Sequence, residues 1–516
     1  MNGAGERADE LLRQLGYESW RAGQREAVVA ALECRDSLIV MPTGGGKSLC
    51  YQLPGLASED LTIVVSPLIA LMRDQWEKLR RLGQPVAMIT SGMTEEVAWE
   101  ALDSVRRDAR IVYCAPERFA SNVFLEALSH RKIDLVAVDE AHCVSEWGHD
   151  FRPDYLRLPE VVERLGRPTV MACTATATVP VAREIASRFG MKEPLQVRSG
   201  FDRPNLSFDV VALEGKGSTA RRQALLEAGL ADPANRPAIV YCGTRRQTEE
   251  VAADLRDAEI AAVAYHAGLE PEHRTAIQER FMATDTGVIC ATNAFGMGVD
   301  KADVRSVWHV TIPTSVEAYY QEAGRAGRDG LPSRATLLAL KSDLGRLVRF
   351  NEQRAGDPEL AIARERGWRA YHVIKDFIYG TECRRRALLD HFSDSTAGAP
   401  LERCCDVCDR LDWLPDPETI AVRKPGREKA AAAPAPDLSP ADAPLFEALK
   451  AWRLTAAAGK PAYTVAANKT LTAIAAARPQ GEDALLAISG VGPAFIEKYA
   501  PEVLALIAEH AAPLAA

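Results

Sequence analysis

The chain has 516 residues, of which 47% are hydrophobic, and a formal net charge of −9. This length predicts about three or four globular domains, and no apolar run approaches the roughly 18 residues of a membrane span. Eleven cysteines, an odd number in a large chain without a signal-peptide core, argue against a disulfide-bonded secreted protein and predict a cytoplasmic one without membrane contact. Because the chain is acidic, any nucleic-acid binding must use local basic patches.

Residues 1–201 and 202–344 alternate short apolar strands with helical patterns, which is the rhythm of a parallel sheet covered by helices. The clearest strands in the first stretch are Ser37–Val40, Leu61–Val65, Ile111–Tyr113, Leu135–Val138 and Thr169–Ala172. Those in the second stretch are Ala238–Tyr241, Ala261–Ala264, Val288–Cys290, Val307–Val310 and Ala335–Leu340. The predicted fold class is therefore α/β, with two parallel-sheet lobes in series and a ligand-binding cleft between them.

Three further segments follow the second lobe. Residues 345–412 are helical in pattern and carry clustered cysteines, which predicts a helical subdomain. Residues 413–440 contain six prolines and the run Ala430–Ala433, a composition typical of an extended linker. Residues 441–516 have the pattern of a small all-α domain.

A phosphate-binding loop is predicted at Met41–Ser48, Met-Pro-Thr-Gly-Gly-Gly-Lys-Ser, directly after the first strand. Backbone N–H groups of such a turn can surround an anion, Lys47 can reach the β- and γ-phosphates, and Ser48 can bind Mg²⁺. The predicted nucleotide ligands are Thr43, Gly44, Gly45, Gly46, Lys47 and Ser48. The strict motif has glycine where Met41 stands, so an ordinary glycine-rich turn is the alternative.

Paired acids end a second apolar strand, Ile133–Val138, ninety residues further on. Asp139 can hold the Mg²⁺ shell, and Glu140 can orient and deprotonate an attacking water. An acidic pair alone is typical of a solvated strand end. Both motifs together, in this order, predict an NTPase.

Seven more segments extend this pattern: Gly16–Gln24, Val65–Gln75, Ala115–Arg118, Cys173–Ala177, Ile239–Thr244, Ala291–Lys301 and Tyr320–Gly330. Their order resembles that of the RecQ family of superfamily 2 helicases, over residues 8–412. The resemblance implies two RecA-like lobes that bind ATP and Mg²⁺, translocate on single-stranded DNA from 3′ to 5′ and unwind duplex DNA in recombination and repair. Its partners would be single-stranded and tailed duplex DNA, and in a bacterium the protein would be associated with the nucleoid.

The same resemblance implies contacts at two of these segments. Gln24 would pair with the adenine edge, and Tyr17 and Arg21 would stack on or contact the nucleotide. In the alternative, these residues only cap an amphipathic helix. Ser66, in the segment Val65–Gln75, would contact DNA phosphates.

Two arginines near residue 325 are predicted to complete the catalytic site. Arg325 and Arg328 lie three residues apart, on one face if this stretch is helical, and either can stabilise charge on the γ-phosphoryl group beside Gln321. Arginine pairs at this spacing are usually solvated. The presence of Lys47 and Glu140 favours the catalytic role without distinguishing the two arginines.

Aromatic side chains interleaved with glycine and arginine occupy Ser145–Tyr155, a composition that suits stacking on unpaired bases. The resemblance implies DNA contacts by Trp147, His149, Phe151 and Arg152. The alternative is a buried helical pair of Trp147 and Phe151, which the intervening Gly148 and the following Pro153 disfavour. A coupling role is implied for His142 as well.

Four cysteines predict a structural Zn²⁺ site, with Cys383, Cys404, Cys405 and Cys408 as tetrahedral ligands. Family members separate the last three cysteines, whereas here two are adjacent. Neighbouring residues of an extended strand point to opposite faces, so joint ligation requires a bend. The alternatives are a metal-free helical subdomain or a site completed by His391.

Residues 441–516 resemble the family's HRDC domain, and their net charge of −1 leaves open a weak DNA tether or a module for single-stranded-DNA-binding or recombination proteins. Family members commonly carry a winged-helix domain after the zinc region, and here the chain passes from Cys408 into the linker instead. A DNA-stimulated ATPase, translocase or strand-annealing remodeller with weak unwinding is therefore an alternative function. An RNA helicase is another, although its acid box usually ends in Asp rather than His142.

Overall fold

The structure, a computed structural model, describes residues 2–42, 44–145, 152–295, 301–353, 361–396, 398–422, 442–457, 465–466, 468–486, 488, 491 and 493–510. The chain divides into two compact units, Met1–Val422 and Arg423–Ala516. Within the described ranges, no helix combines the length and apolar composition that a membrane crossing needs. The predicted site residues Thr43, Trp147, His149 and Phe151 lie outside the described residues.

The first lobe is built on a parallel sheet of seven strands in the order β3-β4-β2-β5-β6-β1-β7. The strands are β1 (Ser37–Val40), β2 (Leu61–Val65), β3 (Val86–Ile89), β4 (Ile111–Cys114), β5 (Ile133–Val138), β6 (Thr169–Thr174) and β7 (Leu195–Arg198). Its helices are α1 (Asn2–Gln14), α2 (Gln24–Leu32), α3 (Lys47–Ala57), α4 (Ile69–Arg81), α5 (Glu95–Arg107), α6 (Asn122–Ser129), α7 (Leu158–Arg164) and α8 (Val179–Arg188).

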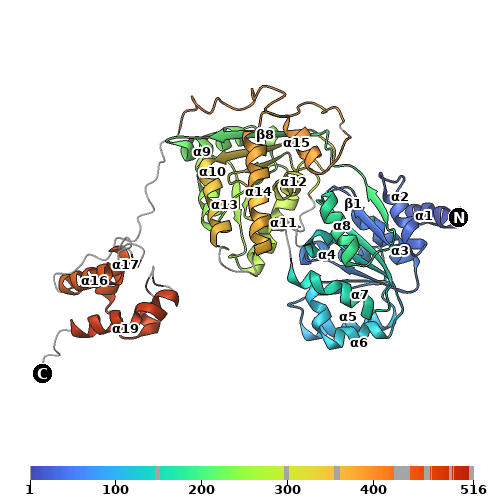
Figure 1. Cartoon of the computed structure of the whole chain (residues 1–516), viewed down its shortest axis with the longest axis horizontal. Helices are drawn as coiled ribbons and strands as arrows, with labels where there is room; N and C mark the ends of the chain where they lie inside the picture. Colours follow the sequence, from blue (N-terminus) through green and yellow to red (C-terminus); the bar gives the residue numbers. More distant parts are fainter. Residues whose placement is uncertain are drawn as a thin grey trace. The chain divides into compact units, whose positions relative to one another are not determined.

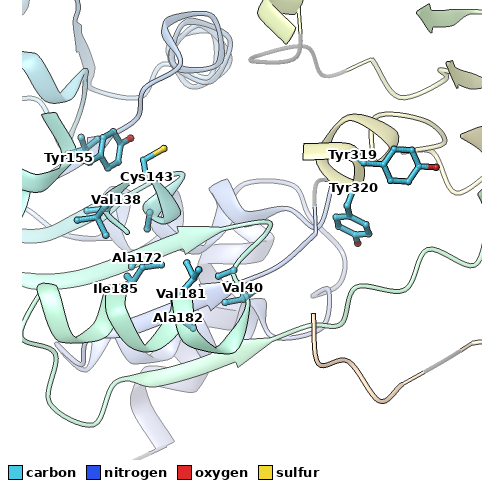
Figure 2. Packing of buried hydrophobic residues seen from close by; sticks show 14 of the residues in the cluster. Val40, Val138, Cys143, Tyr155, Ala172, Val181, Ala182, Ile185, Tyr319 and Tyr320 are labelled. Atoms are coloured by element: carbon cyan, nitrogen blue, oxygen red, sulfur yellow. The ribbon is translucent and has the colours of Figure 1, made fainter. Parts of the chain in front are cut away.

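Side-chain alternation along β1 shows how both faces of this sheet are covered. Leu38 and Val40 pack in the cluster that includes α5–α8, whereas Ile39 and Met41 pack in the cluster that includes α2–α4. Figure 2 shows the first of these faces, with residues of α8 lying over β1, β5 and β6. A strand buried on both faces must be apolar throughout, which is why the central strands read as continuous apolar runs.

The second lobe repeats the architecture with a six-stranded parallel sheet in the order β10-β11-β9-β12-β13-β8. The strands are β8 (Leu206–Leu213), β9 (Ala238–Tyr241), β10 (Ala262–Tyr265), β11 (Val288–Ala291), β12 (Ser306–His309) and β13 (Ser333–Leu340). Its helices are α9 (Ser218–Ala231), α10 (Arg245–Asp257), α11 (Pro271–Ala283) and α12 (Val316–Ala323). Figure 1 shows both lobes with helices around their sheets.

The predicted fold class is confirmed, and all ten expected strands are present within a few residues of their predicted ends. Three strands were missed: β3, β7 and β8. Each is an edge strand. Only β7 is largely solvated, and its Gln196 and Arg198 weaken the apolar signal, whereas β3 is apolar but only four residues long. Polar residues within β8, such as Ser207 and Asp209, obscure the pattern further.

The remainder of the first unit contains α13 (Lys341–Gln353), α14 (Ala361–Tyr379) and α15 (Arg384–His391), which pack against the second lobe. After α15 the chain returns along β8, where the Phe208 N–H donates to the Cys404 carbonyl at 3.0 Å. The predicted boundary of the linker at residue 413 is corrected. Leu414 is buried in the core of the second lobe, and Trp413 packs edge-on against Trp308 with ring centroids 5.6 Å apart, so this unit extends to Val422.

The second unit is helical, as predicted. It contains α16 (Ala443–Ala456), α17 (Asn468–Ala477), α18 (Glu482–Leu486) and α19 (Pro493–Glu509). A small core includes Leu445, Leu449, Leu471 and Val503. The indole N–H of Trp452 donates to Glu502 at 2.6 Å and ties α16 to α19.

Candidate active site

The predicted phosphate loop lies between the end of β1 and the start of α3, at the carboxyl edge of the first sheet. Gly44 and Gly46 have φ angles of 82° and 80°, a left-handed conformation that favours glycine. A Cβ atom on Gly46 would lie only 2.3 Å from Nε2 of Gln24. The loop therefore requires glycine at both positions, and it leads into the N-terminus of α3, where helix-end N–H groups favour an anion.

Lys47 is the first residue of α3, and its ammonium group folds over the loop. Nζ donates to the carbonyl oxygens of Met41 at 3.0 Å and Pro42 at 3.4 Å. Both acceptors are uncharged, whereas Lys47 is a half-buried cation. Phosphate oxygens are stronger partners for an ammonium group, so the side chain is well placed to exchange these bonds for a nucleotide.

The segment Gly16–Gln24, which precedes the phosphate loop in the chain, packs against that loop. Gln24 is 3% exposed; its Nε2 donates to the carbonyl of Gly46 at 3.0 Å and its Oε1 accepts from the Arg21 N–H at 2.8 Å. The Arg21 guanidinium donates to the Gly44 carbonyl, and Tyr17 is exposed. Gln24 thus holds the shape of the phosphate loop, and its contact with adenine stays a prediction.

Asp139 directly follows β5 and is 4% exposed. Its Oδ2 accepts a long hydrogen bond from the Ser66 hydroxyl at 3.4 Å, and the Tyr155 hydroxyl donates to its backbone carbonyl at 3.0 Å. Burial and the neighbouring charge of Glu140 raise the pKa of Asp139 to about 7, while Lys47 opposes this shift. A buried carboxylate so weakly satisfied fits the coordination shell of a divalent cation.

Glu140 adopts a left-handed backbone conformation, with φ 49° and ψ 43°, which is costly for a residue with a side chain and typical of active sites. Its buried Oε2 accepts no hydrogen bond from the described residues and lies 3.3 Å from Nδ1 of His142. The same ring nitrogen is 2.9 Å from the hydroxyl of Thr174. A polar chain therefore links the acid box to the end of β6, and Thr174 is a participant that sequence reasoning missed.

Replacing Asp139 with asparagine is expected to stabilise the nucleotide-free protein, more so at high pH. The folded-state pKa of about 7 lies above the ordinary value of 3.8. The group's contribution to stability is therefore present below about pH 4 and is lost as the pH rises to about 7, by at most about 4 kcal/mol. The gain in Tm over wild type should be larger at pH 8 than at pH 5. Equal gains at both pH values would show that burial does not shift this pKa.

The two predicted arginines follow α12 in the second lobe and occupy different surroundings. Arg325 is 6% exposed, and its guanidinium group lies beside the hydroxyl of Tyr241, whose pKa burial raises to about 12. Arg328 is half-buried, and its Cγ atom lies 3.5 Å from the position that a Cβ on Gly44 would occupy. Gln321 lies on α12. Arg328 is therefore the arginine that reaches the phosphate loop of the first lobe.

Two residues of the connection between the lobes hold the loop that carries these arginines, and sequence reasoning did not assign them. The guanidinium of Arg203 donates to the carbonyls of Gly324, Ala326 and Gly327 at 3.1, 2.9 and 2.8 Å. The amide of Asn205 donates to the Gly327 carbonyl at 2.8 Å. No local pattern assigns them, because their partners lie more than a hundred residues away.

The predicted DNA-contacting residues are only partly described. Ser66 is 2% exposed, and its hydroxyl donates to Asp139. In this structure Ser66 therefore binds the acid and does not lie on the surface. Arg152 is half-buried, and its N–H donates to the Cys143 carbonyl at 3.2 Å. DNA contact by either residue stays a prediction.

The four predicted cysteine ligands converge. The sulfur atoms of Cys383, Cys404, Cys405 and Cys408 all lie within 4.8 Å of one another, and that of Cys383 is 3.5 Å from that of Cys404. Zn–S bonds of about 2.3 Å place tetrahedral sulfurs about 3.8 Å apart, so the cluster fits zinc. His391 instead pairs with Glu317 at 2.7 Å, which removes the alternative of a histidine ligand.

A turn resolves the difficulty of the adjacent cysteines. The N–H of Cys404 donates to the carboxylate of Asp409 at 2.7 Å, and the N–H of Asp409 donates to the Cys405 carbonyl at 2.9 Å. The chain is bent here, so both thiols face the same side. Although burial opposes the shift, hydrogen bonds from the Arg386 backbone N–H and from the neighbouring thiols lower the pKa of Cys383, which favours the thiolate that metals bind.

Comparison with known proteins identifies helicase and HRDC domains in this chain. Three family models match: a DEAD/DEAH box helicase domain over residues 21–185, a helicase conserved C-terminal domain over residues 206–330, and an HRDC domain over residues 442–507. Among solved structures, the DUF1998 helicase MrfA bound to DNA and AMPPNP is similar with a TM-score of 0.55 and 20% identity, over 68% of this chain and 53% of that one. At this identity the likeness shows the fold alone.

Curated relatives are more similar. The ATP-dependent DNA helicase RecQ of Haemophilus influenzae is 36% identical over 410 residues, which cover 78% of this chain and 64% of that protein. A putative ATP-dependent DNA helicase Q1 of Caenorhabditis briggsae is 33% identical over 426 residues, covering 81% of this chain and 67% of the relative. The chain thus spans slightly less than two thirds of the bacterial relative's length. With its two RecA-like lobes, its cysteine cluster and its HRDC domain, the protein belongs to the RecQ family of DNA helicases.

Proposed function

We propose that the protein is an ATP-dependent DNA helicase that moves along single-stranded DNA from 3′ to 5′ and unwinds duplex DNA in recombination and repair. One observation carries the proposal most directly: Arg328 of the second lobe lies against Gly44 in the phosphate loop of the first. A nucleotide bound at this loop touches both lobes. Its binding and hydrolysis can then change the angle between them, which is how a two-lobed motor takes steps.

The residues around the loop have separate tasks in hydrolysis. When bound, ATP would supply the phosphoanhydride bond that is broken. Lys47 would hold its phosphate oxygens, and Ser48 and Asp139 would hold the Mg²⁺ ion. Glu140 orients the attacking water and accepts its proton. Arg328 stabilises the negative charge that develops on the γ-phosphoryl oxygens.

The hydrogen bond between His142 and Thr174 is proposed to couple changes at Asp139 and Glu140 to the rest of the lobe. His142 is 2% exposed and lies 3.3 Å from Glu140 on one side and 2.9 Å from Thr174 on the other. A shift of Glu140 on hydrolysis therefore moves the end of β6. Single-stranded and tailed duplex DNA are the proposed substrates.

The cysteine cluster is proposed to hold one zinc ion. Cys383, Cys404, Cys405 and Cys408 fit a closed four-sulfur site, which is structural because it leaves no open position for a substrate. When bound, zinc would join the start of α15 to the segment that runs along β8. The HRDC domain is proposed to bind single-stranded-DNA-binding or recombination proteins.

Unwinding of a short duplex with either a 3′ or a 5′ single-stranded tail, with ATP and Mg²⁺, tests the proposal. We expect separation of the 3′-tailed duplex alone, and no separation by a Lys47→Ala protein. ATP hydrolysis that DNA stimulates without separation of either duplex would instead indicate a translocase or remodeller. Stronger stimulation by RNA than by DNA would identify an RNA helicase.

A further inference from the structure

The connection between the two lobes, residues 199–205, is gripped by side chains from two other parts of the chain. It leaves β7 of the first lobe at Arg198 and enters β8 of the second lobe at Leu206. Gly200 within it has a φ of 88°, a conformation that permits a sharp change of direction. The conformation of this segment therefore determines how the second lobe approaches the phosphate loop.

Phe201 is the centre of the grip and is 3% exposed. Its ring stacks on that of Phe392, with centroids 4.3 Å apart and an interplanar angle of 3°, and lies 5.9 Å from the ring of Tyr320. Tyr320 and Phe392 also contact each other, at 4.9 Å. Three rings from three segments thus form one cluster, and such ring pairs stabilise a structure beyond the burial of their area.

The peptide groups of Phe201 are bound from both sides. Its N–H donates to Oδ2 of Asp394 at 2.5 Å, and its carbonyl accepts from the Tyr320 hydroxyl at 2.6 Å. Asp394 is 9% exposed. Hydrogen bonds from Thr396 and Phe201 outweigh its burial and lower its pKa. The connection therefore has little freedom at this residue.

On one side the grip comes from the loop between Cys383 and Cys404. This loop contains Phe392 and Asp394, and it also binds Asp202. The Gly398 N–H donates to the carboxylate of Asp202 at 2.6 Å, and the guanidinium of Arg385 donates to the same carboxylate at 2.6 Å. The Phe392 carbonyl accepts from Arg198 at 3.0 Å. This loop is closed by the cysteine cluster, so the cluster supports the grip.

On the other side the grip comes from α12. Tyr319 and Tyr320 leave this helix in different directions (Figure 2): Tyr319 packs against Phe208 and Phe377, whereas Tyr320 reaches the connection. Tyr320 directly precedes Gln321 and stands eight residues before Arg328. Phe201 is therefore linked to the arginine loop through α12, in addition to the direct hydrogen bonds of Arg203 and Asn205.

We propose that Tyr320, Phe392 and Asp394 are positioning residues that clamp Phe201 and thereby set the approach of Arg328 to the phosphate loop. The inference rests on the proposed ATPase function and adds to it a physical link from the cysteine-closed loop to the arginine. The clamp acts on the catalytic step and not on nucleotide affinity, because none of these side chains contacts the phosphate loop in the described structure.

Two variants and one control test the clamp in the full-length protein. Tyr320→Phe removes one hydroxyl and keeps the ring, and Asp394→Ala removes the acceptor of the Phe201 N–H. Ser395→Ala changes an exposed neighbour in the same loop and serves as the control. The measurements are kcat and KM for ATP with single-stranded DNA, Tm, and amide hydrogen exchange of the peptide spanning residues 198–205.

Each clamp variant is expected to lower kcat by about tenfold, with KM for ATP within about twofold of wild type, because a displaced arginine affects the transition state. Exchange of the peptide should accelerate by about tenfold, and Ser395→Ala should change neither value. Unchanged exchange and kcat in both variants would overturn the clamp. A fall in kcat together with an equal rise in KM and a lower Tm would show general destabilisation instead. If the wild-type protein hydrolyses ATP without DNA stimulation, the proposed function itself fails.

Discussion

Replacement of Lys47 by alanine is expected to lower the rate of ATP hydrolysis by about three orders of magnitude. The ammonium group is the one cation of α3 that sits on the phosphate loop, bound to the carbonyls of Met41 and Pro42. With ATP bound, it would exchange these partners for β- and γ-phosphate oxygens, where negative charge grows during the reaction. Steady-state hydrolysis with saturating single-stranded DNA measures the effect.

Folding should be unaffected by this change, because Lys47 is half-buried and its two acceptors can bind water instead. The Tm of the variant is therefore expected to stay within a few degrees of wild type. Lys78→Ala is a matched control, since this lysine of α4 is exposed and pairs only weakly with Asp74 across one helical turn. Wild-type hydrolysis by the Lys47→Ala protein would mean that nucleotide binds elsewhere.

Replacement of Cys405 by serine is expected to have the largest effect on stability, a fall in Tm of about 10 °C. Cys405 is fully buried and belongs to the only described group of four cysteines whose sulfurs meet. It also forms a parallel β-bridge with Phe208 of β8, so the loss of the metal would loosen this segment and the loop that grips the lobe connection. Metal analysis should find about one zinc per wild-type chain.

Cys34→Ser is the matched control for this experiment, because Cys34 is exposed and lies outside the cluster. Chelation of the wild-type protein should reproduce the fall in Tm of Cys405→Ser, and should leave Cys405→Ser itself almost unchanged. Zinc-free wild-type protein with the same Tm as the Cys34→Ser protein would rule out a structural metal.

Local sequence was sufficient for the parts of this protein that are contiguous in the chain. The phosphate loop could be predicted because a buried strand, a glycine turn and Lys47 follow one another within eleven residues. The central strands could be predicted because burial on both faces demands uninterrupted apolar residues. The edge strand β7 escaped, since partial solvation removes that demand and its sequence includes Gln196 and Arg198.

The cysteine cluster could be predicted only in part from the sequence. Residue type and spacing predicted the ligands, but whether Cys404 and Cys405 face the same side depended on the turn that Asp409 stabilises. The end of the linker was misplaced because proline-rich residues 413–422 gain burial against the second lobe, where Trp413 and Leu414 pack. Composition alone does not reveal a surface on which such a segment can pack.

The sequence by itself determined the family, the two α/β lobes, the phosphate loop and the acid pair, because each rests on neighbouring residues or on their order. Only the tertiary structure decided which arginine reaches Gly44, that Thr174 continues the chain from Glu140 and His142, and that Asp394 binds Phe201. These contacts join residues separated by tens to hundreds of positions. They exist because folding brings strand ends and loops to one edge, which no local pattern encodes.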